Sequence, residues 1–290
     1  MRMTTKLRQL LASDRVAWTA AAYDGLTAKL VAEAGFDCVA AAGFQISAAM
    51  GLPDAELYTM TENLAAVRNI VRSAGIPVMA DIDTGYGNAI NVMRTVREFE
   101  QAGVASVQIE DQVAPKTCPA MGEGEMISLE EGVGKIKAAV AARTDPDLVI
   151  SARTDATTPE EACVRVKAYA AAGADLVFVI NKCVKNFEEL KQIRAAAGVP
   201  LKLHLMGWLE ELTPEQIREV SNCAGWAFPT VMTVTEALRR NLTALRETKS
   251  SKNLPVPQTS LADFKKFIGF PEIERYQDLY LPKTDPRNRH

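Results

Sequence analysis

The sequence is short of histidine, having only His204 and the terminal His290. A zinc site usually needs several His or Cys ligands, and a serine–histidine–aspartate triad needs a histidine beside its nucleophile. The scarcity excludes a multi-histidine zinc site and disfavours the triad. Acid–base chemistry would then fall to carboxylates, Cys, Lys, Tyr or a metal-bound water.

Cysteine pairs, long apolar runs and a strong net charge are also missing. The five cysteines are scattered and form no CxxC pattern, which argues against a disulfide framework or a thiolate metal site. No apolar run reaches about 18 residues, so no membrane span is expected. A net charge of −3 gives no electrostatic case for binding nucleic acid. Residues 1–13 show no secretory signal, and we expect a cytoplasmic protein.

A repeated phrase is present instead: a helical pattern, then Ala-Gly or a close variant, then a short apolar run. Glycine commonly ends a helix, and a short β-branched run after it is typical of a buried parallel strand. Helical patterns such as Met60–Ser73, Ile90–Gln101 and Pro159–Ala172 separate the runs, with Thr158 a candidate N-cap. The predicted strands are Val16–Ala22, Cys38–Ala42, Val78–Asp81, Val104–Ile109, Leu148–Ala152, Leu176–Ile180, Leu201–Leu205 and Trp226–Val231.

Eight strands alternating with helices predict a (β/α)₈ barrel of the α/β class, with an open parallel sheet as the alternative. No GxGxxG or Walker A motif follows any predicted strand. Beyond residue 240 the chain becomes charged, bends at Leu254–Pro257, and shows a capping box at Ser260 and Asp263. We therefore predict a barrel domain, 1–240, and a C-terminal helical extension, 241–290.

Polar side chains gather at the carboxyl ends of the predicted strands, where such barrels place their active sites. Asp81 and Asp83 stand two positions apart and should face the same side of a strand. Two adjacent carboxylates repel each other unless a cation or a shared proton offsets their charge. With Glu110 and with Asp54 from a Gly-Leu-Pro-Asp turn, they predict an oxygen site for Mg²⁺, with Mn²⁺ as a substitute.

Other strand ends add groups for a substrate. Arg153 offers a planar cationic fork for a carboxylate, although an internal ion pair is its alternative role. Cys118 lies in a polar, glycine-containing segment expected to be an exposed, mobile loop, and Lys116 is a neighbour able to lower its pKa. As a general acid, Cys118 could protonate a carbanion.

These residues resemble the isocitrate lyase and phosphoenolpyruvate mutase superfamily. The segments that carry the resemblance are Tyr23-Asp24, Gly51–Asp54, Asp81–Gly87, Glu110–Gln112, Pro115–Cys118 and Ala152–Ala156. The resemblance implies a (β/α)₈ barrel, Mg²⁺, an enolate-type intermediate and a homotetramer that exchanges a C-terminal helix between paired subunits. Cys118 looks like the catalytic cysteine of the lyase branch, of which methylisocitrate lyase is the nearest pattern.

The substrate-binding positions depart from the family. Ala41-Ala42-Gly43 stands where a Ser-Gly-Gly often binds a carboxylate, Asn181 stands where glutamate is typical, and His204 stands where asparagine is typical. Thr117, Pro119 and Ala120 replace the usual neighbours of the cysteine. The barrel and the metal site therefore carry over from the family more directly than the identity of the substrate.

The sequence predicts a Mg²⁺-dependent lyase that cleaves a C–C bond of a small 2-hydroxy or 2-oxo polycarboxylate. Tyr23, Glu110 and a metal-bound water are open as the base, while Tyr23 and Asp24 also stand near the substrate. One alternative is oxaloacetate decarboxylation or hydrolysis, or phosphonopyruvate-type P–C chemistry, on the same platform. Another is a non-catalytic protein that binds a metal and a dicarboxylate.

Overall fold

The computed structural model describes residues 1–118, 121–122 and 124–283. The chain folds as two compact units, Met1–Met232 and Thr233–His290. The division between the two units falls between Met232 and Thr233, inside a helix, whereas the sequence predicts a boundary between residues 240 and 241. Pro119, Ala120 and Glu123 of the predicted loop lie outside the described residues.

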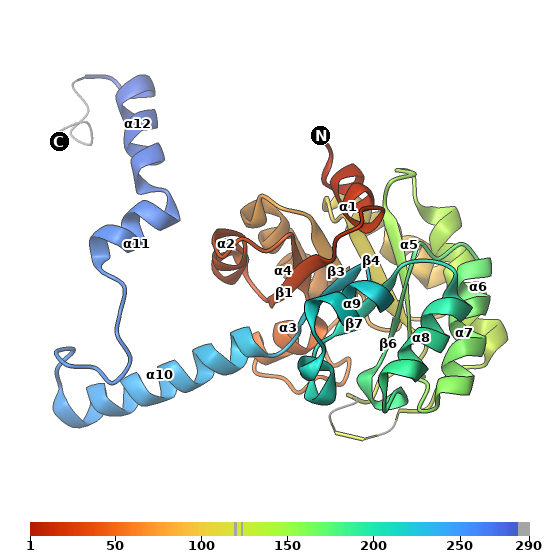
Figure 1. The fold of residues 1–290 in the computed structure, drawn as a ribbon. Helices are drawn as coiled ribbons and strands as arrows, with labels where there is room; N and C mark the ends of the chain where they lie inside the picture. The colour runs from red at the N-terminus through yellow and green to blue at the C-terminus, as the bar shows by residue number, and fades with distance from the viewer. Residues whose placement is uncertain (119–120, 123, 284–290) are drawn as a thin grey trace. The chain divides into compact units, whose positions relative to one another are not determined.

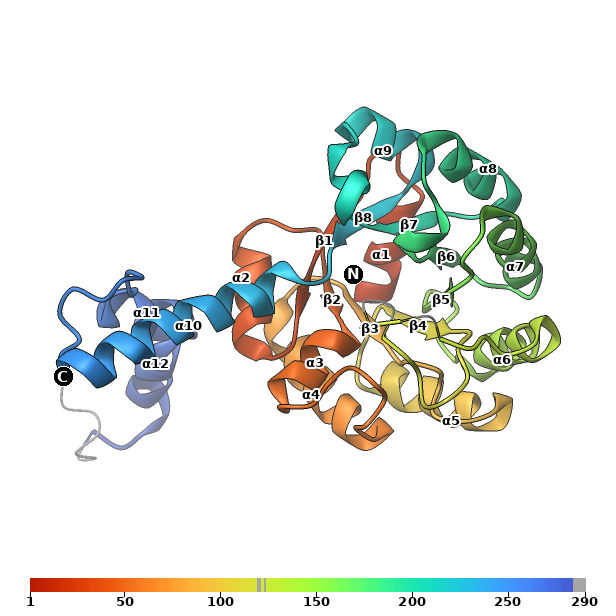
Figure 2. The same cartoon turned by 90° about the horizontal axis from the view of Figure 1, so that it is seen from below.

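The first unit is a closed barrel of eight parallel strands, each paired with its neighbours in sequence order. Figure 2 shows the ring of strands with helices outside it. The predicted (β/α)₈ fold is confirmed. The strands are β1 Ala17–Ala22, β2 Cys38–Ala41, β3 Val78–Asp81, β4 Ser106–Glu110, β5 Val149–Thr154, β6 Leu176–Val179, β7 Leu201–His204 and β8 Cys223–Trp226.

Helices alternate with the strands around the barrel (Figure 1). The Thr158 side chain accepts a hydrogen bond from the Glu161 amide, which confirms the predicted N-cap. The helices are α1 Met3–Leu11, α2 Gly25–Glu33, α3 Gly43–Ala49, α4 Met60–Ala74, α5 Ala89–Gln101, α6 Leu129–Ala142, α7 Pro159–Ala171, α8 Phe187–Ala197, α9 Pro214–Val220, α10 Pro229–Thr248, α11 Leu261–Ile268 and α12 Phe270–Tyr280, with 3₁₀ turns η1 Asn181–Cys183 and η2 Gly207–Glu211.

The prediction of the eighth strand at Trp226–Val231 is wrong. The strand ends at Trp226, and Pro229 begins α10. The β-branched Thr230 and Val231 suggested a strand, but Pro229 has the φ angle that suits a first helical turn. Tertiary pairing with β1 and β7 instead selects the small residues Cys223–Gly225.

Helix α1 closes the amino-terminal end of the barrel. Leu7, Leu10 and Leu11 are buried against residues that open several strands, among them Ala17 and Val149. Figure 2 places α1 near the barrel axis. The carboxyl ends of the strands, where the polar groups lie, are consequently the open end.

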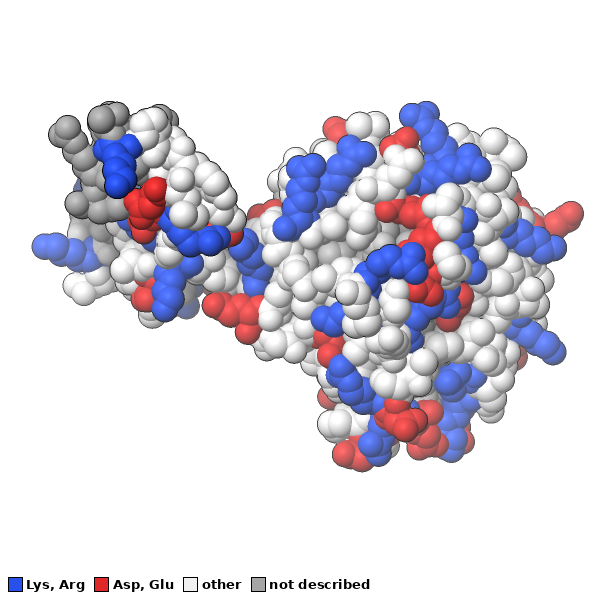
Figure 3. Space-filling model, turned by 90° about the horizontal axis from the view of Figure 1, so that it is seen from above, with Lys and Arg blue, Asp and Glu red and all other residues white. Residues whose placement is uncertain are grey.

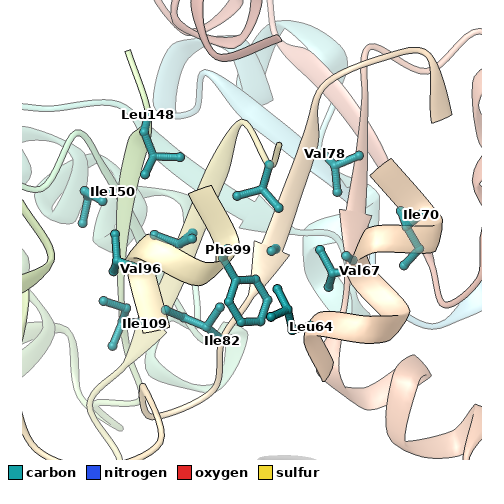
Figure 4. Close-up of a cluster of buried hydrophobic side chains, with 14 of the residues drawn as sticks. Leu64, Val67, Ile70, Val78, Ile82, Val96, Phe99, Ile109, Leu148 and Ile150 are labelled. Atoms are coloured by element: carbon teal, nitrogen blue, oxygen red, sulfur yellow. The ribbon is translucent and has the colours of Figure 1, made fainter. Parts of the chain in front are cut away.

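The main hydrophobic core lies between the barrel wall and the surrounding helices. Figure 4 shows Leu64 and Val67 of α4 and Phe99 of α5 packed over Ile82 and the neighbouring strands. This packing holds β3 and β4 in register, with Asp81 paired beside Gln108. It fixes the backbone that carries the acidic residues.

The second unit contains most of α10, together with α11 and α12. The Ser260 side chain accepts a hydrogen bond from the Asp263 amide, so the predicted cap begins α11. In the described part of the chain, no helix is long and apolar enough to cross a membrane. Figure 3 shows basic and acidic side chains interspersed over the face that it draws.

Candidate active site

Asp81 and Asp83 lie close together at the end of β3, as predicted. Asp83 stands just beyond the strand with a φ of 49°, so its direction is set by a turn and not by strand alternation. A Cβ added at Gly43 would lie 3.0 Å from Asp83 Oδ1 and 3.2 Å from Asp81 Oδ2, which shows how closely the two carboxylates approach α3. Only a glycine leaves room for both at this point.

Lys116 supplies the cation that offsets this charge. Its Nζ lies 2.5 Å from Asp83 Oδ1, 3.0 Å from Asp54 Oδ1 and 3.9 Å from Glu110 Oε1. Lys116 is itself buried, and a buried charge requires such partners. The ammonium therefore faces the carboxylates, and the predicted support of the Cys118 thiolate by Lys116 stays a prediction.

Burial and neighbouring charges shift the pKa values of Asp83, Glu110 and Lys116. Burial raises the pKa of the Asp83 carboxyl to about 6, although the Lys116 ammonium opposes the shift. Burial also raises the pKa of Glu110 well above its usual range, against the pull of Arg153 and Lys116. For Lys116, burial alone would lower the pKa, but the surrounding carboxylates raise it well above normal. Lys116 consequently stays charged.

Arg153 is held from two sides. Its NH1 lies 2.7 Å from Glu110 Oε2, the neighbouring position on β4, while Nε and NH2 donate to the two oxygens of Asp155 at 2.9 and 3.0 Å. The internal ion pair that the sequence left as an alternative is thus present. Of the five N–H donors of the guanidinium, Nε and NH2 donate to Asp155, while NH1 is drawn toward Glu110 by an ion pair.

A pocket opens at the carboxyl ends of the strands and is lined by both polar and apolar residues. Its polar lining residues are Asp54, Asp81, Cys118, Arg153, Asn181, Lys182 and His204. Its apolar lining residues are Ala42, Phe44, Phe178, Ile180, Leu205, Met206, Ala227 and Phe228. The structure therefore brings most of the predicted catalytic and substrate-binding residues to one place.

Cys118 is not exposed as predicted, because only 4% of its surface is accessible. It nevertheless lines the pocket, because the backbone around it is fastened on two sides: the Lys116 and Thr117 amides donate to Glu56 and Gln112. A thiol that is buried yet faces a pocket is placed to meet a bound ligand and not bulk water.

Three predicted substrate residues are not among the described residues that line the pocket. Asp24 is the N-cap of α2 and accepts the Thr27 amide at 2.8 Å. Tyr23 is half-buried against the barrel core, and burial raises the pKa of its hydroxyl. Gly43 donates its amide to Asp81 Oδ2 at 3.3 Å.

His204 lines the pocket and packs against the ring of Phe178. Its ring lies 4.4 Å from the Phe178 ring, centroid to centroid, and burial lowers its pKa well below the usual value, with Lys202 and Arg153 adding to the shift. Because the same ring also lies beneath the Arg153 guanidinium at 5.6 Å, Phe178 is a shared platform for both side chains. His204 is consequently neutral and adds no positive charge.

Sequence reasoning missed Glu56, Tyr58 and the role of Gln112. Glu56 accepts the Thr84 hydroxyl at 2.6 Å and the Lys116 amide at 3.2 Å. A Cβ added at Gly43 would lie 2.9 Å from the Tyr58 hydroxyl, so Tyr58 also reaches the aspartates. Glu56 and Tyr58 stand two and four positions after Asp54 in an irregular segment, where such a spacing indicates no shared face, so no sequence signal points to them.

The acidic residues fit a hard cation. Four buried carboxylate oxygens, Asp54 Oδ1, Asp83 Oδ1 and both of Glu110, accept no hydrogen bond from the described residues, and the Lys116 and Arg153 cations face them. Among the same residues, no three Asp, Glu, His or Cys side chains are arranged to hold a metal ion directly. The four carboxylate oxygens suit Mg²⁺, a hard cation that prefers oxygen ligands and reaches some of them through water.

Comparison with known proteins agrees with this geometry. A family model described as phosphoenolpyruvate phosphomutase matches residues 7–251. The chain is 40% identical to a 2,3-dimethylmalate lyase of Eubacterium barkeri, over 97% of this chain and 99% of that one. It is 44% identical to an oxaloacetate decarboxylase of Ectopseudomonas mendocina, over 71% of each. A phosphonopyruvate hydrolase crystallised with oxalate and Mg²⁺ superimposes with a TM-score of 0.88 at 30% identity, covering 97% of this chain and 100% of that one.

The barrel, its polar open end and these relatives define an enzyme of the carbon–carbon lyase class. The chain belongs to the phosphoenolpyruvate phosphomutase family. It is thereby a member of the isocitrate lyase and phosphoenolpyruvate mutase superfamily, as the sequence resemblance predicted.

Proposed function

We propose that the protein is a Mg²⁺-dependent lyase that cleaves a C–C bond of a small 2-hydroxy dicarboxylate carrying alkyl substituents. The observation that carries the proposal is that Cys118, Arg153 and Asp81 line one pocket together with eight apolar residues, among them Phe44, Leu205 and Phe228. The 40% identity to a 2,3-dimethylmalate lyase over nearly the full length of both chains supports the same substrate class.

The charges of the pocket favour a dicarboxylate over a tricarboxylate such as methylisocitrate. Among the described lining residues, the cations are Arg153 and Lys182, and His204 is neutral. Lys182 is exposed, and its Nζ lies 3.5 Å from the Gly122 carbonyl oxygen. With Arg153 committed in part to Glu110 and Asp155, the pocket has little positive charge for a third carboxylate.

The apolar lining residues of the pocket suit alkyl groups. Phe44 of α3 and Phe228 meet edge to face at 4.8 Å between ring centroids, and Leu205 and Met206 line the same pocket. Burying one methyl or methylene group contributes about 0.8 kcal/mol. A substrate with methyl groups would gain this binding free energy, whereas a dicarboxylate without them would leave the apolar lining residues in contact with water.

The chain's own residues can perform the cleavage. Arg153 holds a substrate carboxylate, and a base takes the proton of the 2-hydroxyl group. The oxygen then forms the carbonyl of a 2-oxo acid, the adjacent C–C bond breaks, and its electron pair passes into the enolate of the departing acid. The Cys118 thiol gives its proton to the enolate carbon, which completes the second product.

Asp81 and Asp54, which line the pocket, and the buried Asp83 and Glu110 would hold the Mg²⁺ ion, several of them through water. When bound, the ion supplies Lewis-acid stabilisation of the negative charge that develops on the substrate oxygen. Mn²⁺ favours the same hard oxygen ligands.

The deciding experiment is turnover of a panel of alkylated and plain malates by Cys118→Ala and Cys118→Ser. Loss of the general acid should lower kcat at least about 100-fold, while oxalate binding, measured by calorimetry with Mg²⁺, changes little. Thiol-independent cleavage, with both variants as active as the wild type, would sink the proposed role of Cys118.

A second candidate, decarboxylation of oxaloacetate, is favoured by the 44% identity to an oxaloacetate decarboxylase. Decarboxylation releases CO₂ and needs no thiol at the reacting carbon if solvent protonates the enolate. Oxaloacetate turnover that persists in Cys118→Ala, with no cleavage of alkyl malates by the wild type, would select this candidate.

We further propose a homotetramer in which the C-terminal helices pack on a second copy of the chain. Helices α10, α11 and α12, all within the described part of the chain, contain no buried residue. Their exposed large apolar residues include Leu238, Leu242, Leu261, Phe264, Phe270, Ile273, Tyr276, Leu279 and Tyr280. Such a set is typical of a surface that a partner covers.

A further inference from the structure

Two consecutive backbone amides fasten the chain just before Cys118. The Lys116 amide donates to Glu56 Oε2 at 3.2 Å, and the Thr117 amide donates to Gln112 Oε1 at 2.8 Å. Glu56 also accepts the hydroxyl of Thr84, the residue after Asp83. The hydrogen bond of the Lys116 amide therefore connects this segment, through Glu56 and Thr84, to the acidic residues. The hydrogen bond of the Thr117 amide connects it to a different part of the site.

The hydrogen bond of the Thr117 amide connects the segment to Arg153. The Nε2 of Gln112 donates a short hydrogen bond to Asp155 Oδ2, and Asp155 in turn accepts both Nε and NH2 of Arg153. Gln112 is 1% exposed, so solvent cannot replace either bond. One buried amide group thus touches the backbone beside Cys118 with its oxygen and the partner of Arg153 with its nitrogen.

The surroundings of Gln112 leave its side chain little freedom. Gly124 packs directly on it, and a Cβ at that position would collide with the Gln112 amide. The backbone of Asp155 is fixed, because its amide donates to Asp111 Oδ1 at 2.9 Å and Asp111 accepts hydrogen bonds from Arg165 and Tyr169 of α7, so a shift at Asp155 is confined to its side chain. The Gln112 side chain is therefore a tightly packed link between the Asp155 carboxylate and the Thr117 amide.

We propose that Gln112 is a positioning residue that couples the placement of Cys118 to the orientation of Arg153. A ligand carboxylate drawn to Arg153 shifts the Arg153–Asp155 pair, and Gln112 passes that shift to the Thr117 amide. The proton donor is then aligned only when the carboxylate is seated. The inference rests on the proposed function for the assignment of Arg153 to a carboxylate.

Two substitutions separate the two bonds of Gln112. Gln112→Met has a similar length and removes both bonds. Gln112→Glu keeps an oxygen for the Thr117 amide but places a carboxylate oxygen against Asp155. Matched controls are Gln101→Met and Gln101→Glu at the exposed end of α5.

Two measurements need no turnover: the rate of Cys118 alkylation by iodoacetamide, read by peptide mass spectrometry, and the affinity for oxalate with Mg²⁺, read by calorimetry. Loss of one buried hydrogen bond to a charged group should change either value about ten-fold. Gln112→Met is expected to accelerate alkylation and weaken oxalate binding, whereas Gln112→Glu weakens oxalate binding alone.

The proposal is overturned if Gln112→Met stays within about two-fold of the wild type in both measurements, a change below about 0.4 kcal/mol. It is also overturned if Gln112→Glu changes both alike. Circular dichroism checks folding, and the Gln112→Glu result decides alone if Gln112→Met does not fold. Failure of the proposed function has a different signature: the wild type would bind no oxalate, while Gln112→Met would still accelerate alkylation.

Discussion

Lys116 carries a positive charge into a space that three carboxylates share. Its ammonium lies within 4 Å of Asp54, Asp83 and Glu110, and all four side chains are almost completely buried. A buried charge costs several kcal/mol to desolvate, and the pairing offsets this cost. Lys116 thus supplies the positive charge that offsets these three carboxylates before any metal ion binds.

Replacing this lysine should therefore destabilise the protein. Lys116→Met leaves three carboxylates without their common partner, and we expect a loss of about 3–5 kcal/mol in the free energy of unfolding. Added Mg²⁺ should restore part of the loss, because it binds the native carboxylates and not the unfolded chain. Urea unfolding with and without Mg²⁺ measures both effects. Equal stability of Lys116→Met and the exposed control Lys137→Met, on α6, would contradict the prediction.

The residues of the site differ in how far the sequence could predict them. Asp81 and Arg153 lie at the carboxyl ends of β3 and β5, and Cys118 follows β4. The carboxyl ends of parallel strands meet at one end of a barrel, so the convergence of these residues follows from the alternating pattern. Glu56 and Tyr58 lie in an irregular segment without any period, and only the folded backbone brings them to Gly43 and Lys116. The burial of Cys118 also depends on such non-local bonds.

At the scale of elements, the sequence predicted most strands and helices because their boundaries carry local signals. Thr59 and Thr158 cap α4 and α7, and Gly75 ends α4 with a left-handed φ of 65°. The eighth strand lacked such signals: its small residues pair with β1 and β7, and a Cβ at Gly225 would collide with the Thr19 backbone. Close packing between strands selected these residues, which no local propensity reveals.

The cap of α7 offers a direct test at this scale. Thr158→Ala removes the side-chain acceptor of the Glu161 amide and should lower the free energy of unfolding by about 1 kcal/mol. The exposed neighbour Thr157 is the matched control, and Thr157→Ala should change stability by less than about 0.5 kcal/mol. Chemical denaturation of the two variants decides, and a Thr158→Ala protein as stable as its control would refute the capping role.

At the scale of the whole molecule, the two units differ in how they bury apolar surface. The barrel encloses its own core, whereas α10, α11 and α12 leave large apolar side chains exposed. Isolated helices of this kind gain most of their stability from packing. The proposed association with a second copy would supply that packing.

The association can be tested on α12. Ile273 and Leu279 are 55% and 60% exposed, and their joint replacement by aspartate should disperse the assembly into smaller species. Light scattering after size-exclusion chromatography measures the mass. Glu274→Ala, on the same helix, is the control expected to keep the wild-type mass. A wild type that elutes as a monomer at micromolar concentration would refute the tetramer.

Helix α1 seals one end of the barrel with Leu7, Leu10 and Leu11. Substitutions in the barrel should consequently fall into two groups, according to the end of the barrel at which they lie. Changes near α1 would alter how much protein survives heating or proteolysis while leaving turnover per folded molecule intact. Changes at the opposite rim would alter turnover in protein that accumulates normally. The fold thus separates the residues that determine stability from the residues that determine catalytic activity, so that each set can change independently in evolution.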